Sequence, residues 1–127
     1  MQKSVVRRST AVIALLIATL FVGLGLTGCA DTSPIDMSNV TEIIDVRSAS
    51  EYAEGHLEGA VNIDVESAAF ADEVGSLDKA GSYVLYCRSG HRAGIALDEM
   101  TSMGFTNVVN AGGYADASAR TGLPIVQ

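Results

Sequence analysis

Residues 83–92 have the sequence Tyr83-Val84-Leu85-Tyr86-Cys87-Arg88-Ser89-Gly90-His91-Arg92. Residues 83–86 are all apolar or aromatic, which is typical of a strand covered on both faces of a parallel sheet. Residues 92–103 then carry apolar side chains at helical spacing, at positions 93, 96, 97 and 100, and Gly104 ends the pattern. This stretch therefore predicts a buried strand, a short loop and a helix.

The remainder of the chain repeats this alternation of strands and helices. We predict further strands at 42–46, 60–63 and 107–109, and further helices at 50–54, 66–74 and from about 114, with Ser50 as a candidate cap of the first helix. Strands that alternate with helices pair in parallel. The prediction is an α/β fold with a central, mostly parallel sheet of about four or five strands and helices on both faces.

Residues 1–30 have the layout of a bacterial export signal. Lys3, Arg7 and Arg8 precede an uncharged stretch from position 9 to position 30, which contains Leu26-Thr27-Gly28-Cys29 near its end. This motif resembles the lipobox of bacterial lipoproteins, so we predict a signal peptide at 1–28 and a lipid on Cys29. The alternative is an uncleaved membrane helix, because about 18 uncharged residues can span a bilayer. In both cases the basic residues stay inside, so the domain lies on the extracytoplasmic face of the cell membrane.

The part of the chain after residue 28 is strongly acidic. Three of the eight Lys and Arg residues lie in 1–28 and all 15 Asp and Glu residues follow, which leaves five basic residues and a formal charge of −10. This charge argues against nucleic acid as a partner and against charge-driven binding to anionic lipid. We assign residues 29–39 to a short tether and residues 40–127 to one small domain, which we expect to be a monomer.

Cys87 is the candidate nucleophile. It and Cys29 are the only cysteines, so a lipidated Cys29 would leave one free thiol in an oxidising compartment. Cys87 opens a loop at the carboxyl end of a predicted parallel strand, where α/β folds bind ligands. The amino end of the next helix, the curl that Gly90 permits and the cations Arg88 and Arg92 all favour an anion there. We therefore expect the thiol to ionise at neutral pH.

Short motifs occur along the chain in a fixed order. They are Ile44-Asp45-Val46-Arg47, Glu51-Tyr52, Gly55-His56-Leu57, Gly59-Ala60, Asn62-Ile63, residues 86–92, Met103-Gly104-Phe105, Gly112-Gly113 and Gly122-Leu123-Pro124. The ordered set covers nearly all of residues 42–126 and resembles the rhodanese-like family, in particular its small periplasmic members of the phage-shock type. The chain departs from many members in having no Trp, and Ala117 stands near the place where they carry one.

The resemblance implies a sulfurtransferase that works without a cofactor. Cys87 would take a sulfane sulfur from thiosulfate or a similar small donor and pass it, as a persulfide, to cyanide or a thiol. Backbone amides of the loop would hold the sulfur and the donor anion. No metal site is expected either, because the chain offers two His and one free Cys.

The loop residues after Cys87 are assigned to substrate binding, and they are Arg88, Ser89, Gly90, His91 and Arg92. We expect Arg88 to recruit an anionic donor at the pocket mouth. Ser89 either donates its hydroxyl to an anion or to the sulfur, or faces solvent. Arg92 has two open roles, which are to anchor the anion or to bond the loop carbonyls. His91 is not assigned as a base, because a thiolate held by amides needs none.

Asp45 and Arg47 stand two residues apart at the end of the first predicted strand. Their position suggests catalysis at first sight. The interpretation adopted is an ion pair or hydrogen-bond network that supports the strand ends and the loop.

Three other functions compete with sulfur transfer. A phosphatase or arsenate reductase of the related branch is disfavoured, because four residues separate Cys87 from Arg92 and those relatives have one more. A non-catalytic binding module is disfavoured by the retained cysteine. An extracytoplasmic thiol redox role, or a persulfide-carrier or sensing role, stays open because the sequence does not name the sulfur donor.

Overall fold

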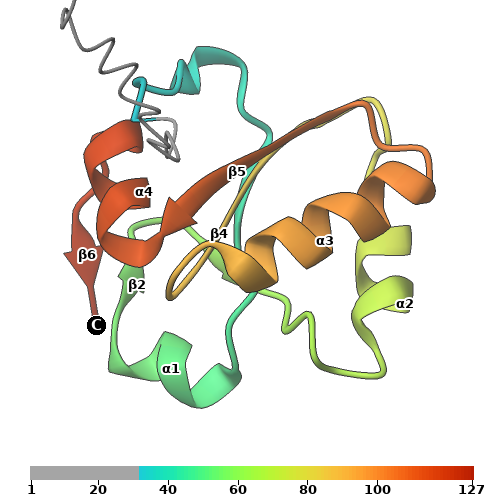
Figure 1. Ribbon diagram of the computed structural model, residues 1–127, viewed down its shortest axis with the longest axis horizontal. Helices are drawn as coiled ribbons and strands as arrows, with labels where there is room; N and C mark the ends of the chain where they lie inside the picture. Colours follow the sequence, from blue (N-terminus) through green and yellow to red (C-terminus); the bar gives the residue numbers. More distant parts are fainter. Residues whose placement is uncertain (1–31) are drawn as a thin grey trace, which may run out of the picture.

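The computed structural model describes residues 32–127, so the predicted signal peptide and Cys29 lie outside the described residues. Within residues 32–127 no helix has the length and apolar character needed to cross a bilayer. The described chain forms a four-stranded sheet flanked by helices (Figure 1), which confirms the predicted α/β fold.

The central sheet has the strand order β3-β1-β4-β5, and its three pairings are all parallel. Its strands are β1 (Glu42–Asp45), β3 (Val61–Asn62), β4 (Ser82–Cys87) and β5 (Asn107–Gly113). The helices are α1 (Ala49–Glu54), α2 (Phe70–Gly75), α3 (His91–Ser102) and α4 (Tyr114–Thr121), and a 3-10 turn, η1, spans Met37–Asn39. A small antiparallel sheet pairs β2 (His56–Leu57) with β6 (Ile125–Val126).

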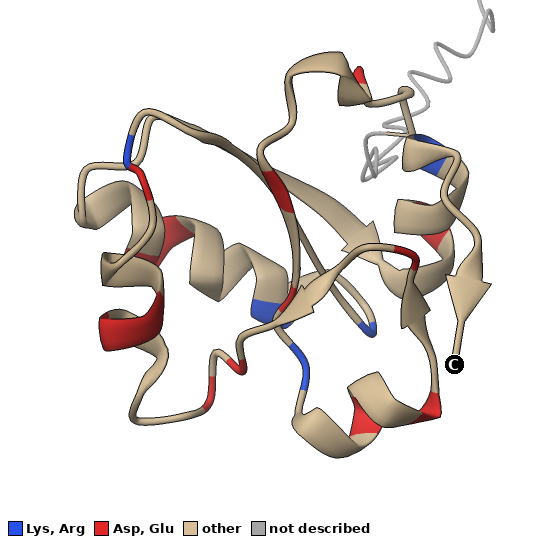
Figure 2. Ribbon diagram, turned by 180° about the vertical axis from the view of Figure 1, so that it is seen from behind, with Lys and Arg blue, Asp and Glu red and all other residues tan. Residues whose placement is uncertain are grey.

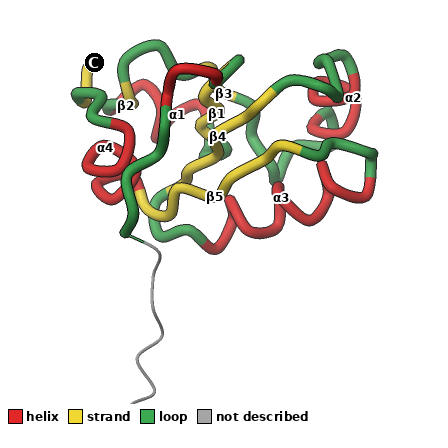
Figure 3. The backbone as a smooth tube through the Cα atoms, turned by 90° about the horizontal axis from the view of Figure 1, so that it is seen from above, coloured by secondary structure: helices red, strands yellow, loops and turns green. Residues whose placement is uncertain are grey.

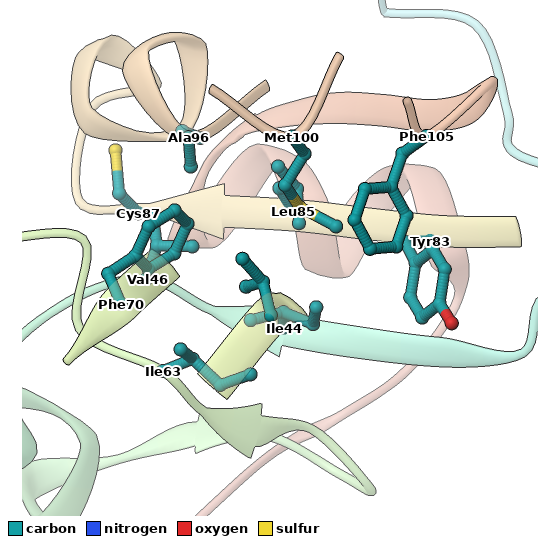
Figure 4. Close-up of a cluster of buried hydrophobic side chains, with 12 residues drawn as sticks. Ile44, Val46, Ile63, Phe70, Tyr83, Leu85, Cys87, Ala96, Met100 and Phe105 are labelled. Carbon is teal, nitrogen blue, oxygen red and sulfur yellow. The ribbon is translucent and has the colours of Figure 1, made fainter. Parts of the chain in front are cut away.

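The central strand β4 is buried because its side chains alternate between two apolar cores. Tyr83, Leu85 and Cys87 belong to the core that α2 and α3 cover, part of which Figure 4 shows. Val84 and Tyr86 belong to the core that α4 covers. Figure 3 shows α3 running alongside β5, so the loop between β4 and α3 ends up at one end of the sheet. Burial of Val84 and Leu85 contributes roughly 1.5–3 kcal/mol each.

The first helix begins two residues earlier than its predicted cap implied. Ser48, not Ser50, is the N-cap of α1, and its Oγ accepts a hydrogen bond from Glu51 N at 3.4 Å. The Glu51 carboxylate accepts one from Ser48 N at 3.2 Å in return. This reciprocal capping box satisfies two backbone donors. Ser50 has no matching partner residue and could not form such a box.

Other boundaries differ where the periodic signal is weak. α2 begins at Phe70 instead of 66, because residues 64–69 are taken up by turns. β5 continues past 109 to Gly113. The strands β2 and β6 escaped prediction because two residues carry no readable periodicity.

Residues 32–40 lie against the α4 side of the domain. Ile35 N donates to Arg120 O at 2.8 Å, and the side chains of Ile35, Met37 and Val40 pack on the core there. Ala117, which stands near the place of the missing Trp, is fully buried in the same core. The described part of the predicted tether therefore contacts the domain.

Candidate active site

The predicted loop lies between the carboxyl end of β4 and α3. Cys87 is the last residue of β4, a free thiol with no exposed surface. Its side chain lies near Val46 and Phe70 in the core (Figure 4), and its sulfur accepts a hydrogen bond from Gly90 N at 3.0 Å. Gly90 has a left-handed φ of 92° and is the N-cap of α3. Glycine adopts this conformation without steric cost, so the curl at Gly90 turns its amide onto the sulfur.

The loop rests on the Gly112-Gly113 pair of β5. The register of β4 and β5 shifts near the end of β4, so that Cys87 pairs with Gly113. A Cβ on Gly113 would lie 2.8 Å from Arg88 O, which is too short for any side chain. A Cβ on Gly90 would lie 3.2 Å from Gly112 Cα, so the two glycine segments are in close contact.

Arg92 is held by acidic side chains from other segments. Its Nη1 and Nη2 donate to the Glu51 carboxylate at 2.8 and 2.9 Å, and Nη1 lies 3.5 Å from Glu66 Oε2. The hydrogen bond from Arg92 lowers the pKa of Glu51 to about 2 and raises the pKa of Arg92. Neither of the two roles expected for Arg92 describes this arrangement, and substrate binding by Arg92 stays a prediction.

Glu51 was not among the predicted site residues. The sequence does carry a signal for it, because a serine three residues before a glutamate is the pattern of a capping box. That pattern fixes where the carboxylate stands on α1. It does not reveal that Arg92, 41 residues away, binds the same carboxylate.

Asp45 and Arg47 form a buried ion pair at the end of β1. Arg47 Nη2 lies 2.5 Å from Asp45 Oδ2, and Arg47 Nε donates to both carboxylate oxygens. Arg47 Nη2 also donates to Gly55 O at 2.6 Å, and the guanidinium lies 4.7 Å from the centroid of the Tyr114 ring. The hydrogen bond to Asp45 raises the pKa of Arg47. That this pair supports the reactive loop stays a prediction.

Two cavities flank the loop, and Cys87 is not among the residues that line them. One, of about 290 Å³, is lined by Arg47, Glu51, Glu54, Gly55, Arg88 and Tyr114. The other, of about 300 Å³, includes Ser89, Gly90 and Asn110 in its lining. Arg88 and Ser89 therefore line different cavities.

The exposed loop side chains differ in how they are engaged. Arg88 is exposed and makes no hydrogen bond or ion pair with residues 32–127. Its guanidinium is thus available to an incoming anion. His91 is exposed at the start of α3. Figure 2 shows basic positions after β1, in the loop and at the start of α3, and acidic positions on several other parts of the ribbon.

These features together make a site for an anionic sulfur species. A thiol at the start of a helix receives an amide hydrogen bond, and the helix dipole favours negative charge at that end. The exposed cation Arg88 can collect an anion, although the thiol itself is covered. Such a site favours nucleophilic chemistry by a thiolate, with amides that hold the charge.

Comparison with known proteins agrees with this arrangement. The model of the rhodanese-like domain family matches residues 32–119. The thiosulfate sulfurtransferase PspE of Escherichia coli is 36% identical over 73 residues, which cover 58% of this chain and 70% of that protein. A sulfurtransferase of Allochromatium vinosum is 32% identical over 84 residues, 66% of this chain and 77% of that protein. A solved structure of a rhodanese with anions from E. coli superposes with a TM-score of 0.56 at 34% identity, and the match covers 68% of this chain and 96% of that one.

Proposed function

Since the chain belongs to the rhodanese-like domain family and is a sulfurtransferase of that type, we propose that it works through a persulfide on Cys87. The donor is thiosulfate or a similar sulfane compound, and the acceptor is cyanide or a thiol. The observation that carries the proposal is the contact of 3.0 Å between Cys87 Sγ and Gly90 N at the amino end of α3.

The reaction proceeds in two displacements that need no external oxidant. The Cys87 thiolate attacks the outer sulfur of thiosulfate, a sulfur–sulfur bond forms, and the sulfur–sulfur bond of thiosulfate breaks. Its electron pair leaves with sulfite, and Cys87 carries a persulfide anion. Cyanide or a thiolate then attacks the outer sulfur, which yields thiocyanate or a new persulfide and returns the Cys87 thiolate.

The residues around the sulfur divide this work. The Gly90 amide and the amino end of α3 stabilise negative charge on the sulfur, as an oxyanion hole does. Arg88, which is free within residues 32–127, collects the anionic donor against the repulsion of the acidic surface. Because Cys87 has no exposed surface, donor entry requires a displacement of the side chains or loop that cover it.

Mass spectrometry of the purified protein after treatment with thiosulfate tests the assignment. We expect a mass gain of one sulfur atom, reversed by cyanide with release of thiocyanate. Cys87→Ser keeps the size of the side chain and should fold normally, gain no sulfur and transfer none. Sulfur transfer by that variant would overturn the assignment, as would wild-type protein that gains no sulfur from any sulfane donor while it hydrolyses an aryl phosphate. If the wild-type protein accepts sulfur only from other persulfides, the result would support the alternative function, that of a persulfide carrier.

We also propose that the domain acts outside the cytoplasm as a monomer tethered by a lipid on Cys29. Residues 1–29 motivate this location, since a basic start precedes an uncharged stretch and the Leu26-Thr27-Gly28-Cys29 motif. A tether there would leave the domain in contact with small periplasmic or extracellular sulfur compounds.

A further inference from the structure

Asn110 joins the reactive loop to the strand beside it. Its Nδ2 donates to Gly90 O at 3.0 Å, and its Oδ1 accepts from Gly112 N at 2.8 Å. A carbonyl oxygen only accepts and a backbone amide only donates, so these two partners fix which way the carboxamide points. The Asn110 main chain is anchored as well, since its carbonyl accepts from Arg120 Nη1 at 3.1 Å.

Gly90, the residue that Asn110 binds, is conformationally the freest residue of the loop. Gly90 supplies the amide that bonds Cys87 Sγ, yet a glycine can rotate between many backbone conformations. Its place at the start of α3 brings no side-chain cap to hold it. Two bonds fix its carbonyl, one from Gly94 N at 3.0 Å within α3 and one from the Asn110 side chain.

We propose that Asn110 is a positioning residue for sulfur transfer, because its carboxamide clamps Gly90 so that the Gly90 amide stays aimed at the Cys87 sulfur. Asn110 does not touch the sulfur itself and acts through Gly90. The proposal rests on the proposed function, in which that amide stabilises the persulfide. An asparagine suits the task because it offers a donor to Gly90 and an acceptor to Gly112 in one short, planar group.

Two variants separate the donor from the acceptor. Asn110→Ala removes both bonds, whereas Asn110→Asp keeps the shape and the acceptor but turns the donor into a second acceptor that faces Gly90 O. We expect both to lower kcat for sulfur transfer from thiosulfate by about three- to tenfold, the worth of one hydrogen bond. The KM for thiosulfate should stay within about twofold, because the donor is collected elsewhere.

A spectroscopic readout observes the clamp without any sulfur donor. The Gly90 amide resonance of the full chain should shift in both variants, and its hydrogen exchange should quicken about tenfold relative to wild type. In Asn110→Asp, acidification protonates the introduced carboxyl, which restores a donor and should return the Gly90 resonance toward its wild-type position. A role in stability alone would not produce this pH-dependent return.

Asn107 provides the matched control on the same strand. Its side chain is exposed and makes no hydrogen bond with residues 32–127. Asn107→Ala and Asn107→Asp should therefore leave kcat and the Gly90 resonance unchanged, and the second also controls for added negative charge. If Asn110→Ala folds poorly, Asn110→Asp decides the question.

The outcomes distinguish this proposal from the function on which it rests. An unmoved Gly90 resonance in Asn110→Asp would overturn the clamp, and so would full kcat in that variant when the wild type transfers sulfur. If the wild type transfers no sulfur from any sulfane donor, the proposed function fails, whatever the Gly90 resonance does.

Discussion

The substitution Asp45→Asn should cost the domain much of its stability. The Asp45 side chain is fully buried, and Arg47 beside it is 6% exposed. The substitution removes the negative charge and leaves the guanidinium buried without its counter-ion. It also weakens the acceptor for three donors of Arg47, which are its backbone N, Nε and Nη2.

The size of the loss follows from what remains around Arg47. Breaking a buried ion pair on one side costs about 3–5 kcal/mol. The bond from Arg47 Nη2 to Gly55 O and the Tyr114 ring at 4.7 Å are the same in both proteins, so they do not enter the difference. The introduced carboxamide still offers one oxygen as an acceptor, which places the loss at the lower end of that range. We therefore expect a loss of about 2–4 kcal/mol in the free energy of unfolding.

Urea denaturation followed by circular dichroism measures this loss, and thermal unfolding should show a fall in Tm of roughly 10–25 °C for a domain of this size. Asp98→Asn on α3 is the control, because Asp98 is exposed and should change stability by less than about 0.5 kcal/mol. The double substitution Asp45→Asn with Arg47→Met removes the stranded charge and should be more stable than Asp45→Asn alone.

Two results would refute this reasoning. One is a loss below about 1 kcal/mol in Asp45→Asn, which would mean that water or another group satisfies Arg47. The other is a double variant no more stable than the single one, which would place the cost in the lost shape of the carboxylate instead of the unpaired charge.

Further predictions concern the loop, the glycine pair of β5 beside it and the amino terminus. The pKa of Glu51 is about 2 in the folded protein and an ordinary 4.5 in the unfolded chain. The difference in unfolding free energy between wild type and Glu51→Gln, measured in urea, should therefore be constant above about pH 5 and shrink as the pH falls from 4.5 towards 2. Gly113→Ala should lower the free energy of unfolding by about 1–3 kcal/mol, because the added Cβ would lie 2.8 Å from Arg88 O. Gly94→Ala should be tolerated, because its added Cβ would have its nearest neighbour at 3.7 Å. Equal urea midpoints for the two variants would contradict this prediction. Arg88→Ala should raise the KM for thiosulfate and flatten its salt dependence in steady-state assays, and an unchanged KM would show that the amides suffice. Cys29→Ser should abolish metabolic lipid labelling and signal removal, and normal processing of that variant would end the lipoprotein interpretation.

The amino-acid sequence was sufficient for those features that depend on neighbours along the chain. Continuous apolar residues at 83–86 indicate a strand covered on both faces, and the spacing of residues 93–100 indicates a helix. These two elements place Cys87 at a strand-to-helix loop. Gly90 indicates the turn that brings a backbone amide to the Cys87 sulfur. Periodicity and turn chemistry are local properties, so they can be read before the fold is known.

The contacts that hold the loop in place depend on which segments become neighbours in space. Glu51 meets Arg92 across 41 residues, and Asn110 meets Gly90 across 20. Gly113 must be small because Arg88 O approaches it, and that approach exists only because β5 pairs with β4. The strand order β3-β1-β4-β5 sets these meetings. Side-chain periodicity shows which face of an element is apolar, but it does not show which element will cover that face. Only the tertiary structure could therefore decide these long-range contacts.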